Sequence, residues 1–525
     1  MRRLFSLFAL LFIAMALAPR PAMADPADVE AAARGVVRVI IIGRDGEEIF
    51  PISHGTGFAV SANRVVTNAH VVAEAVEDDR LAIGVVPSEG SEAVYARLVA
   101  VSPRNDLALL QLTEPLGLTP LTIAGNPETT GEVTAVGYPM NVDRAQGLGQ
   151  SDIFRAQPPV TATGFLSGRR PSRDFDTVLH TAPIAAGNSG GPLLDDCGRV
   201  LGVNSFGTAS DGADAEFFFA VSTRELLPFL RANGITPRVN ALPCRSIADL
   251  DAEELARQQM VAEAQRQQDE DEAEALAVQT EDARRTQTFA VMDERANGMA
   301  LSFLLLLVAL GAGLFAAFQH VEEQHRLRAI GGAVSGLALV LALVAWITRP
   351  GFAEIDERVE EQLHADAPTD QPSGAITAPV VGASTGGSYA CVLDTDRSRV
   401  VSAPETDLAV EWTADGCVNG RTQYGLADGR WTRVFVPSSE SAVSINRFDP
   451  EGGEMVMERY LLDLDAMNAA RSARAGFEAP ACGAGEEAAR ALGASQAAIT
   501  QALPARPNER LVYRCSAGAA PTAGE

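Results

Sequence analysis

Lysine is absent from this sequence of 525 residues, so all 42 of its basic residues are arginine. They are outnumbered by 68 acidic residues, and the formal net charge is −26. A nucleic-acid-binding protein needs a basic face for the phosphate backbone. This charge balance therefore argues against nucleic acid as a partner.

Histidine is also scarce, with six residues, and no C-x-x-C pair or histidine cluster accompanies the six cysteines. That absence argues against a metal site, and we expect no cofactor. The even number of cysteines predicts disulfides in an oxidising compartment. We expect nearest-neighbour pairs within each domain, of which Cys197 with Cys244 is the first. The others are Cys391, Cys417, Cys482 and Cys515.

The N-terminus has the pattern of an export signal. Arg2 and Arg3 precede a long apolar run, which ends in the small residues of Ala22 to Ala24. This pattern predicts a signal peptide over residues 1–24, cleaved before Asp25. An uncleaved signal anchor is the alternative, and with either one the domain that follows is exported.

Two further apolar runs without charge, residues 299–318 and 329–348, are long enough to span a bilayer. A helix of about 20 residues covers the hydrocarbon core of about 30 Å. The connector between the runs is short, so we expect a transmembrane hairpin. It contains Arg326 and Arg328, whereas acidic residues flank the hairpin on both outer sides. The positive-inside rule places the connector in the cytoplasm and both large soluble parts outside.

The composition divides the rest of the chain into distinct segments. Short apolar runs separated by turn residues, from Gly35 to about Val239, predict an all-β barrel or sandwich. Its closing helix would be capped by Ser222 or Thr223 and would end at Gly234.

Residues 246–297 are rich in Ala, Glu, Gln and Arg and predict a long polar helical spacer. Its weak heptad pattern favours a solvated single helix over a self-association element. Residues 365–388 have the composition of a flexible linker. Hairpin-like runs followed by an Ala-rich stretch predict a small α+β domain over residues 389–515.

One serine, Ser189 in "GNSGG", lies in a glycine-rich turn between apolar segments. A serine becomes a nucleophile only with a base, and the base needs a partner that orients it. Of the three histidines in the β-rich segment, His70 follows a strand in "VVTNAHVV", whereas His54 and His180 have no comparable context. Asp106 directly precedes the apolar strand "LALLQL" and could accept an imidazole N–H.

These motifs, in the order His, Asp, Ser, resemble those of chymotrypsin-fold serine proteases, and most of all the HtrA/Deg branch. The resemblance covers about residues 35–235. It implies that Ser189 is the nucleophile, His70 the general base and Asp106 the group that fixes its tautomer. The backbone amides of Gly187 and Ser189 would form the oxyanion hole.

The resemblance also implies a substrate pocket. Trypsin-like members carry an Asp six residues before the serine, where this chain has Pro183. An apolar pocket favours small or medium aliphatic side chains before the cut bond. HtrA proteins usually carry a PDZ domain after the protease, and we recognise none in this sequence. In its place we expect a membrane hairpin and a second exported domain. The pocket residues would be Pro183, Ile184, Asn204, Ser205, Phe206 and Phe217.

The sequence therefore predicts an all-β, two-barrel chymotrypsin-like domain over residues 25–240, a polar helix, a transmembrane hairpin and a small C-terminal domain. The expected function is a membrane-anchored serine endopeptidase acting on proteins or peptides. It would reside in a bacterial inner membrane with both soluble domains facing the periplasm or exterior, and the C-terminal domain could regulate it. The alternative is a catalytically silent, protease-like sensor or scaffold.

Overall fold

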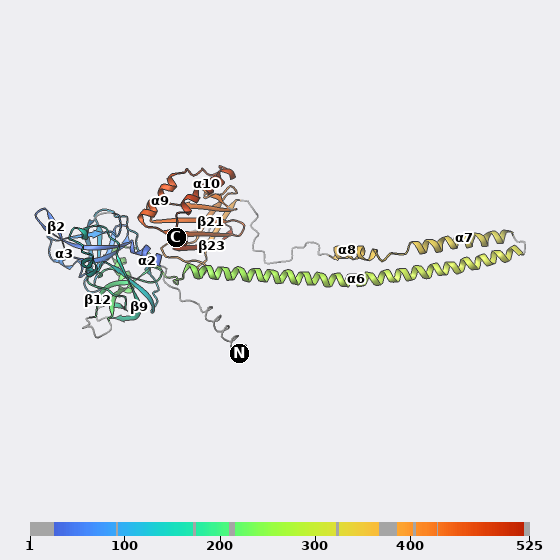
Figure 1. Ribbon diagram of the computed structural model, residues 1–525, viewed down its shortest axis with the longest axis horizontal. Helices are drawn as coiled ribbons and strands as arrows, with labels where there is room; N and C mark the ends of the chain where they lie inside the picture. The colour runs from blue at the N-terminus through green and yellow to red at the C-terminus, as the bar shows by residue number, and fades with distance from the viewer. Residues whose placement is uncertain are drawn as a thin grey trace, which may run out of the picture. The chain divides into compact units, whose positions relative to one another are not determined.

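The computed structural model describes residues 26–90, 93–171, 175–208, 216–321, 325–366, 386–402, 406–427 and 429–518. The expected signal peptide and most of the expected linker lie outside these residues. The described chain forms two compact units (Figure 1). One contains residues up to Glu254 together with the C-terminal domain, and the other begins at Leu255 and contains the helical hairpin.

A closed six-stranded barrel forms the first half of the β-rich domain. Side chains alternate along each strand. Val37, Val39 and Ile41 are buried in one cluster of the barrel, whereas Phe58 and Leu109, on two other strands, pack in a second cluster with residues of the next barrel. In barrel order the strands are β1 (Val36–Asp45), β2 (Glu48–Ser61), β3 (Arg64–Thr67), β6 (Leu107–Leu112), β5 (Val94–Ser102) and β4 (Ala82–Val86).

A second ring of six strands closes because β11 pairs with both β8 and β12. The two barrels are those expected of a chymotrypsin-like fold. Ser222 stands at the N-cap of helix α5 (Thr223–Ala232), but its hydroxyl donates to Asp176 instead of capping the helix. The ring runs β11 (Pro192–Leu194), β8 (Gly131–Gly137), β9 (Val160–Pro171), β10 (Asp176–His180), β13 (Phe218–Ser222) and β12 (Val200–Gly207), and β7 (Ile123–Ala124) and β14 (Val239–Asn240) extend it.

Three smaller helical elements belong to the β-rich domain. They are α3 (Ala73–Glu77), α4 (Met140–Ala145) and the 3-10 turn η1 (Asp152–Phe154). Helix α4 directly follows β8. The Met140 amide at its start donates to the Ala186 carbonyl at 2.8 Å, so the helix begins beside the turn that holds Ser189.

The C-terminal domain is an antiparallel sheet of nine strands with helices α9 (Leu464–Ala475) and α10 (Glu486–Thr500). Tyr389, Trp412 and Phe448 lie in one of its clusters, and Val443, Met467 and Ile499 in another. The sheet order is β18 (Thr422–Gln423), β17 (Cys417–Val418), β16 (Leu408–Trp412), β15 (Gly387–Leu393), β23 (Glu509–Ala517), β22 (Glu454–Leu461), β21 (Ala442–Asp449), β20 (Arg430–Phe435) and β19 (Gly425–Ala427).

Three disulfides join the six cysteines. Cys197 pairs with Cys244, as expected. The nearest-neighbour expectation is wrong for the C-terminal domain, which pairs Cys391 with Cys515 and Cys417 with Cys482. The reason is the strand order: β15 and β23 are adjacent, and Cys391 lies opposite Cys515 in their register. The first and last strands of the domain are thereby joined.

A buried ion pair connects the C-terminal domain to α2 (Pro26–Ala33), a helix at the start of the β-rich domain. Arg399 pairs with Asp28, and their side chains are 3% and 1% exposed. Asn508 Nδ2 also donates to the Asp28 carboxylate at 2.9 Å, and Arg399 Nε donates to the Arg245 carbonyl at 2.6 Å. The charge of Arg399 is thus satisfied by a carboxylate and by backbone oxygens.

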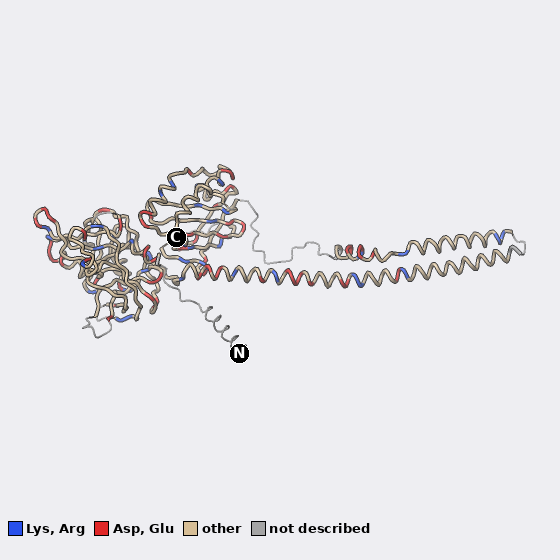
Figure 2. Tube along the Cα trace, in the orientation of Figure 1, with Lys and Arg blue, Asp and Glu red and all other residues tan. Residues whose placement is uncertain are grey.

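The second unit continues a single helix, α6 (Ile247–Val321), through the expected spacer and the first expected span. Charged side chains are spread along α6 as far as Arg295 and are absent from its distal part and from most of α7 (His325–Ile347) (Figure 2). Both helices are long and apolar enough to cross a membrane. Ser302 and Ser335 donate to carbonyls of the facing helix at 3.2 and 2.8 Å.

Helix α8 (Glu354–Asp366) returns along the charged part of α6. Val359 packs in a cluster with Val291 of α6. Arg358 pairs with both Glu294 of α6 and Glu354 of its own helix. The hairpin therefore extends beyond the apolar segments as two antiparallel helices.

Candidate active site

The candidate base and its partner meet at one end of the first barrel. His70 follows β3 and Asp106 precedes β6, two neighbouring strands. His70 Nδ1 lies 3.0 Å from both Asp106 carboxylate oxygens, and the His70 amide donates to Oδ1 at 3.2 Å. Asn68 Nδ2 donates to the Asp106 carbonyl at 2.8 Å. These contacts hold Asp106 at φ +51°, a backbone conformation that is uncommon for a residue other than glycine.

The candidate nucleophile approaches this pair from the second barrel. Ser205 connects the two, since its hydroxyl donates to Asp106 Oδ2 and its carbonyl accepts a hydrogen bond from Ser189 Oγ at 3.0 Å. The Ser189 carbonyl in turn accepts from the Thr56 amide at 2.8 Å, across to the first barrel. In the described part of the chain the Ser189 hydroxyl donates its hydrogen bond to the Ser205 carbonyl and not to the His70 ring. Catalytic hydrogen bonds often form only when substrate is bound.

The turn before Ser189 exposes two backbone amides. Gly187 has φ +104°, and a Cβ there would lie 2.2 Å from the Tyr138 carbonyl oxygen, so only glycine fits. The Ala186 carbonyl accepts from the Met140 amide at 2.8 Å. In a trans peptide the N–H points away from the C=O, so the Gly187 N–H faces away from Met140. Among the described residues, the amides of Gly187 and Ser189 donate to no protein acceptor.

Residues 55–203 match the family model of the trypsin-like peptidase domain. The chain contains a trypsin-like peptidase domain. It is 33% identical over 238 residues to the serine protease Rv3671c of Mycobacterium tuberculosis, covering 43% of this chain and 53% of that protein. It is 34% identical over 175 residues to a DegP-like probable periplasmic serine endoprotease of Brucella suis, covering 33% and 31% of the two chains. The chain thus spans about half or less of the length of these relatives.

Two solved structures are similar to part of this chain. The active form of the Rv3671c protease is 28% identical, with 42% of this chain and 90% of that chain covered and a TM-score of 0.32. The serine endoprotease of Yersinia pestis is 25% identical, with 40% and 65% covered and a TM-score of 0.31.

The expected pocket residues of the peptidase domain differ in their surroundings. Pro183 is exposed, whereas Ile184 packs against a core cluster of the second barrel. Asn204 is fully buried and donates to the Pro192 carbonyl at 3.0 Å. Phe206 is 44% exposed and stacks on Phe219 at a centroid distance of 4.8 Å. The Phe217 carbonyl accepts from the Thr208 amide at 2.8 Å.

His54 and His180, which lie in no motif like that of His70, have different environments in the structure. His180 is fully buried beside Phe218, and burial lowers its pKa to about 4, so it stays neutral. His54 lies 3.1 Å from the Asp143 carboxylate, and burial is the main cause that lowers its pKa. The contact between His54 and Asp143 joins residues 89 positions apart, and no local pattern indicates it.

Thr56 was also not expected to contribute. Its hydroxyl donates to the Gly187 carbonyl at 2.6 Å and accepts from the Tyr138 amide at 3.0 Å. It therefore links the turn before Ser189 to the end of β8. Thr56 lies in the "GTGF" of the first motif, and that motif is the only signal that could have indicated it.

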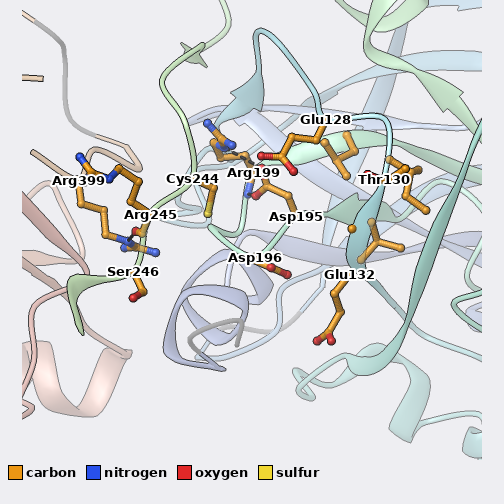
Figure 3. A pocket seen from close by; sticks show the side chains of 14 residues that line it. Glu128, Thr130, Glu132, Asp195, Asp196, Arg199, Cys244, Arg245, Ser246 and Arg399 are labelled. Atoms are coloured by element: carbon orange, nitrogen blue, oxygen red, sulfur yellow. Dashed lines mark hydrogen bonds and ion pairs between the residues drawn. The ribbon is translucent and has the colours of Figure 1, made fainter. Parts of the chain in front are cut away.

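A cavity of about 200 Å³ lies away from these residues, beside the disulfide of Cys197 and Cys244 (Figure 3). No residue of the candidate triad lines it. Four of its lining side chains are acidic, and burial together with Glu132, Asp195 and Glu128 raises the pKa of Asp196 to about 6. The four are Glu128, Glu132, Asp195 and Asp196.

The Asp196→Asn variant should be more stable than the natural chain at pH 7.5. The raised pKa of Asp196 means that its ionised form is disfavoured in the folded state. The free energy of unfolding therefore falls as the pH rises from the unfolded pKa to about 6. After discounting for solvent screening at this partly exposed site, we expect a gain of about 1 kcal/mol. Thermal unfolding at pH 7.5 and at pH 4 measures it, and the gain should vanish at pH 4. A gain that persists at pH 4 would show that the charge is not its cause.

Proposed function

We propose that this chain is a membrane-anchored, exported serine endopeptidase in which Ser189 attacks the substrate carbonyl. The observation that carries the proposal is the link from His70 and Asp106 through Ser205 to Ser189, beside two backbone amides that have no acceptor among the described residues. A structural turn would need neither the imidazole–carboxylate pair nor the free amides. The relatives named as serine proteases support the same reaction class.

The proposed reaction begins when substrate draws the Ser189 hydroxyl from the Ser205 carbonyl to His70 Nε2. His70 takes the proton as Ser189 Oγ bonds to the carbonyl carbon, while Asp106 holds the Nδ1 proton and stabilises the imidazolium. The amides of Gly187 and Ser189 bind the oxyanion, each contributing about 3 kcal/mol. His70 then protonates the leaving amine, and an acyl-enzyme remains. Water hydrolyses it by the same steps, with His70 again as base.

Cleavage should favour small or medium aliphatic residues before the cut bond. Pro183 occupies the position of the acidic residue that holds a basic side chain in trypsin-like members, and Ile184 and Phe206 are apolar. Profiling the full chain on a peptide library would measure the preference, with Ser189→Ala as the control for contaminating activity. We expect Val, Ala or Ile to dominate. Enrichment of Arg or Lys would contradict the proposed pocket.

Both soluble domains should lie on the exported side of the membrane. The apolar parts of α6 and α7 form an antiparallel hairpin, and α8 returns along α6, so the chain enters and leaves on one side. Periplasmic reporter fusions should be active after residue 290 and after residue 370 and inactive at about residue 324. An inactive fusion at residue 370 would contradict the hairpin and leave the cysteines of the C-terminal domain in a reducing compartment.

A silent, protease-like sensor is the second candidate. One observation favours it, namely that the Ser189 hydroxyl donates to Ser205 instead of His70. In a silent protein this hydrogen bond would persist when peptide binds. Peptide binding without turnover, with equal affinity in the natural chain and Ser189→Ala, would support this candidate over the enzyme.

A further inference from the structure

We infer that Asp143 and His54 are positioning residues. They hold the turn of the second barrel that carries the Gly187 and Ser189 amides, here called the oxyanion turn, in a fixed position relative to His70 of the first barrel. This inference rests on the proposed function. Among the described residues, neither side chain forms a hydrogen bond or ion pair with the candidate triad, and both act through the end of β8 and the start of α4.

The first observation is a buried charge cluster between the barrels. Asp143 belongs to α4 of the second barrel and is 8% exposed. Its carboxylate accepts from Arg38 Nη2 of β1 at 2.9 Å and lies 3.1 Å from His54 Nε2 of β2. Both partners belong to the first barrel. Removing one member of such a buried cluster leaves another charge or polar group without compensation.

The protonation state of the cluster follows from its neighbours. Burial and the charge of Arg38 lower the pKa of His54, so its ring is neutral at pH 7. His54 Nε2 faces two acceptors, the Asp143 carboxylate and the Tyr138 carbonyl at 3.2 Å, and must carry the ring proton. The positive charge of Arg38 then balances the negative charge of Asp143. The Arg38 guanidinium also lies 4.6 Å from the centre of the Tyr138 ring.

The second observation is that this cluster holds the backbone on which the oxyanion turn rests. The Tyr138 carbonyl, which faces His54, lies directly against Gly187. The Tyr138 amide donates to Thr56, whose hydroxyl donates to the Gly187 carbonyl. Two residues on, the Met140 amide fixes the Ala186 carbonyl and with it the direction of the Gly187 N–H.

These two observations together explain why the cluster is buried at this place. Catalysis needs His70 from one barrel and the amides of Gly187 and Ser189 from the other in a fixed geometry. A misplacement of about 1 Å can cost about 100-fold in rate. Arg38 and His54 hold α4 against the first barrel, and the backbone of Tyr138 and Met140 transmits that position to Gly187.

The test compares Asp143→Asn with Asp176→Asn in the full chain. Asp176 is a matched control because it is a paired carboxylate of the same barrel that binds Arg169 and Ser222. We expect Asp143→Asn to lower kcat about 100-fold and to change KM less than about twofold, because the oxyanion is bound only in the transition state. Asp176→Asn should leave both constants within about twofold of the natural chain.

His54→Ala is the second variant, since it keeps the pair of Arg38 and Asp143 and should fold even if Asp143→Asn does not. We expect it to lower kcat about tenfold, and His54→Gln to restore part of the loss because its amide can donate to the Tyr138 carbonyl. Equal kcat in His54→Ala and the natural chain would overturn the inference.

Hydrogen exchange of the Met140 and Asn188 amides, followed by mass spectrometry, gives a readout that does not depend on activity. Both amides donate within or to the oxyanion turn and should exchange faster in Asp143→Asn than in Asp176→Asn. Faster exchange in a chain that hydrolyses nothing would contradict the proposed function and support the positioning role. Unchanged exchange and unchanged kcat in an active chain would overturn the positioning role alone.

Discussion

The Ser189→Ala variant of the full chain should lose hydrolysis of an unfolded protein substrate by a factor of about 10⁴ or more. The remaining oxyanion amides and binding contacts support only slow attack by water, without a covalent intermediate. Initial rates of peptide release, measured at equal concentrations of the purified chains, give the factor. Rates within tenfold of the natural chain would mean that another group is the nucleophile.

Further single and double variants complete this experiment. His70→Ala should lose as much as Ser189→Ala, and Asp106→Asn should lose about 10⁴-fold because the imidazole then adopts the wrong tautomer. Combined with Ser189→Ala, neither should cause a further loss, since the three groups act as a unit. Ser61→Ala is the matched control, because Ser61 belongs to the same domain and its exposed hydroxyl donates to the Asn63 side chain at 3.3 Å.

The second large effect is expected on stability. Arg399→Met should destabilise the assembly of peptidase domain and C-terminal domain by about 3–5 kcal/mol, because it removes the positive charge that compensates the buried Asp28 carboxylate. The expected result is a clearly lower thermal midpoint for the transition that includes these domains. Differential scanning calorimetry of the detergent-solubilised chain measures it.

A double variant separates the ion pair from general packing. Asp28→Leu with Arg399→Met replaces both charges by apolar groups and should recover most of the lost stability. Arg490→Met is the control, since Arg490 pairs with Glu486 on an exposed helix surface and should contribute less than about 1 kcal/mol. Equal midpoints for Arg399→Met and Arg490→Met would show that the contact with Asp28 does not hold the two domains together.

Local sequence patterns predict a β-rich domain and the apolar hairpin because each rests on short-range regularities, whereas the division into two barrels was implied only by the resemblance of the three motifs. The strands of the peptidase domain alternate or are uniformly apolar, and the motifs around His70, Asp106 and Ser189 lie at strand ends. The continuity of α6 through Gly298 was not predicted. A single glycine costs a helix about 1 kcal/mol, which many good helix formers on both sides outweigh.

The features that the sequence did not predict depend on contacts between distant residues. Cys391 pairs with Cys515 because the first and last strands of the C-terminal domain are neighbours, a topology that the spacing of cysteines does not contain. Likewise, Arg38, His54 and Asp143 meet only after both barrels have formed. His54 alone has no pattern that distinguishes it from a surface histidine.

Covalent labelling of the proposed nucleophile, Ser189, tests the central claim most directly. The full chain, solubilised in detergent, is treated with a fluorophosphonate probe, digested and mapped by mass spectrometry. The account predicts one modified peptide, with the probe on Ser189, and loss of the label in Ser189→Ala and His70→Ala but not in Ser61→Ala. Label on another serine, or a folded chain that takes no label, would contradict it.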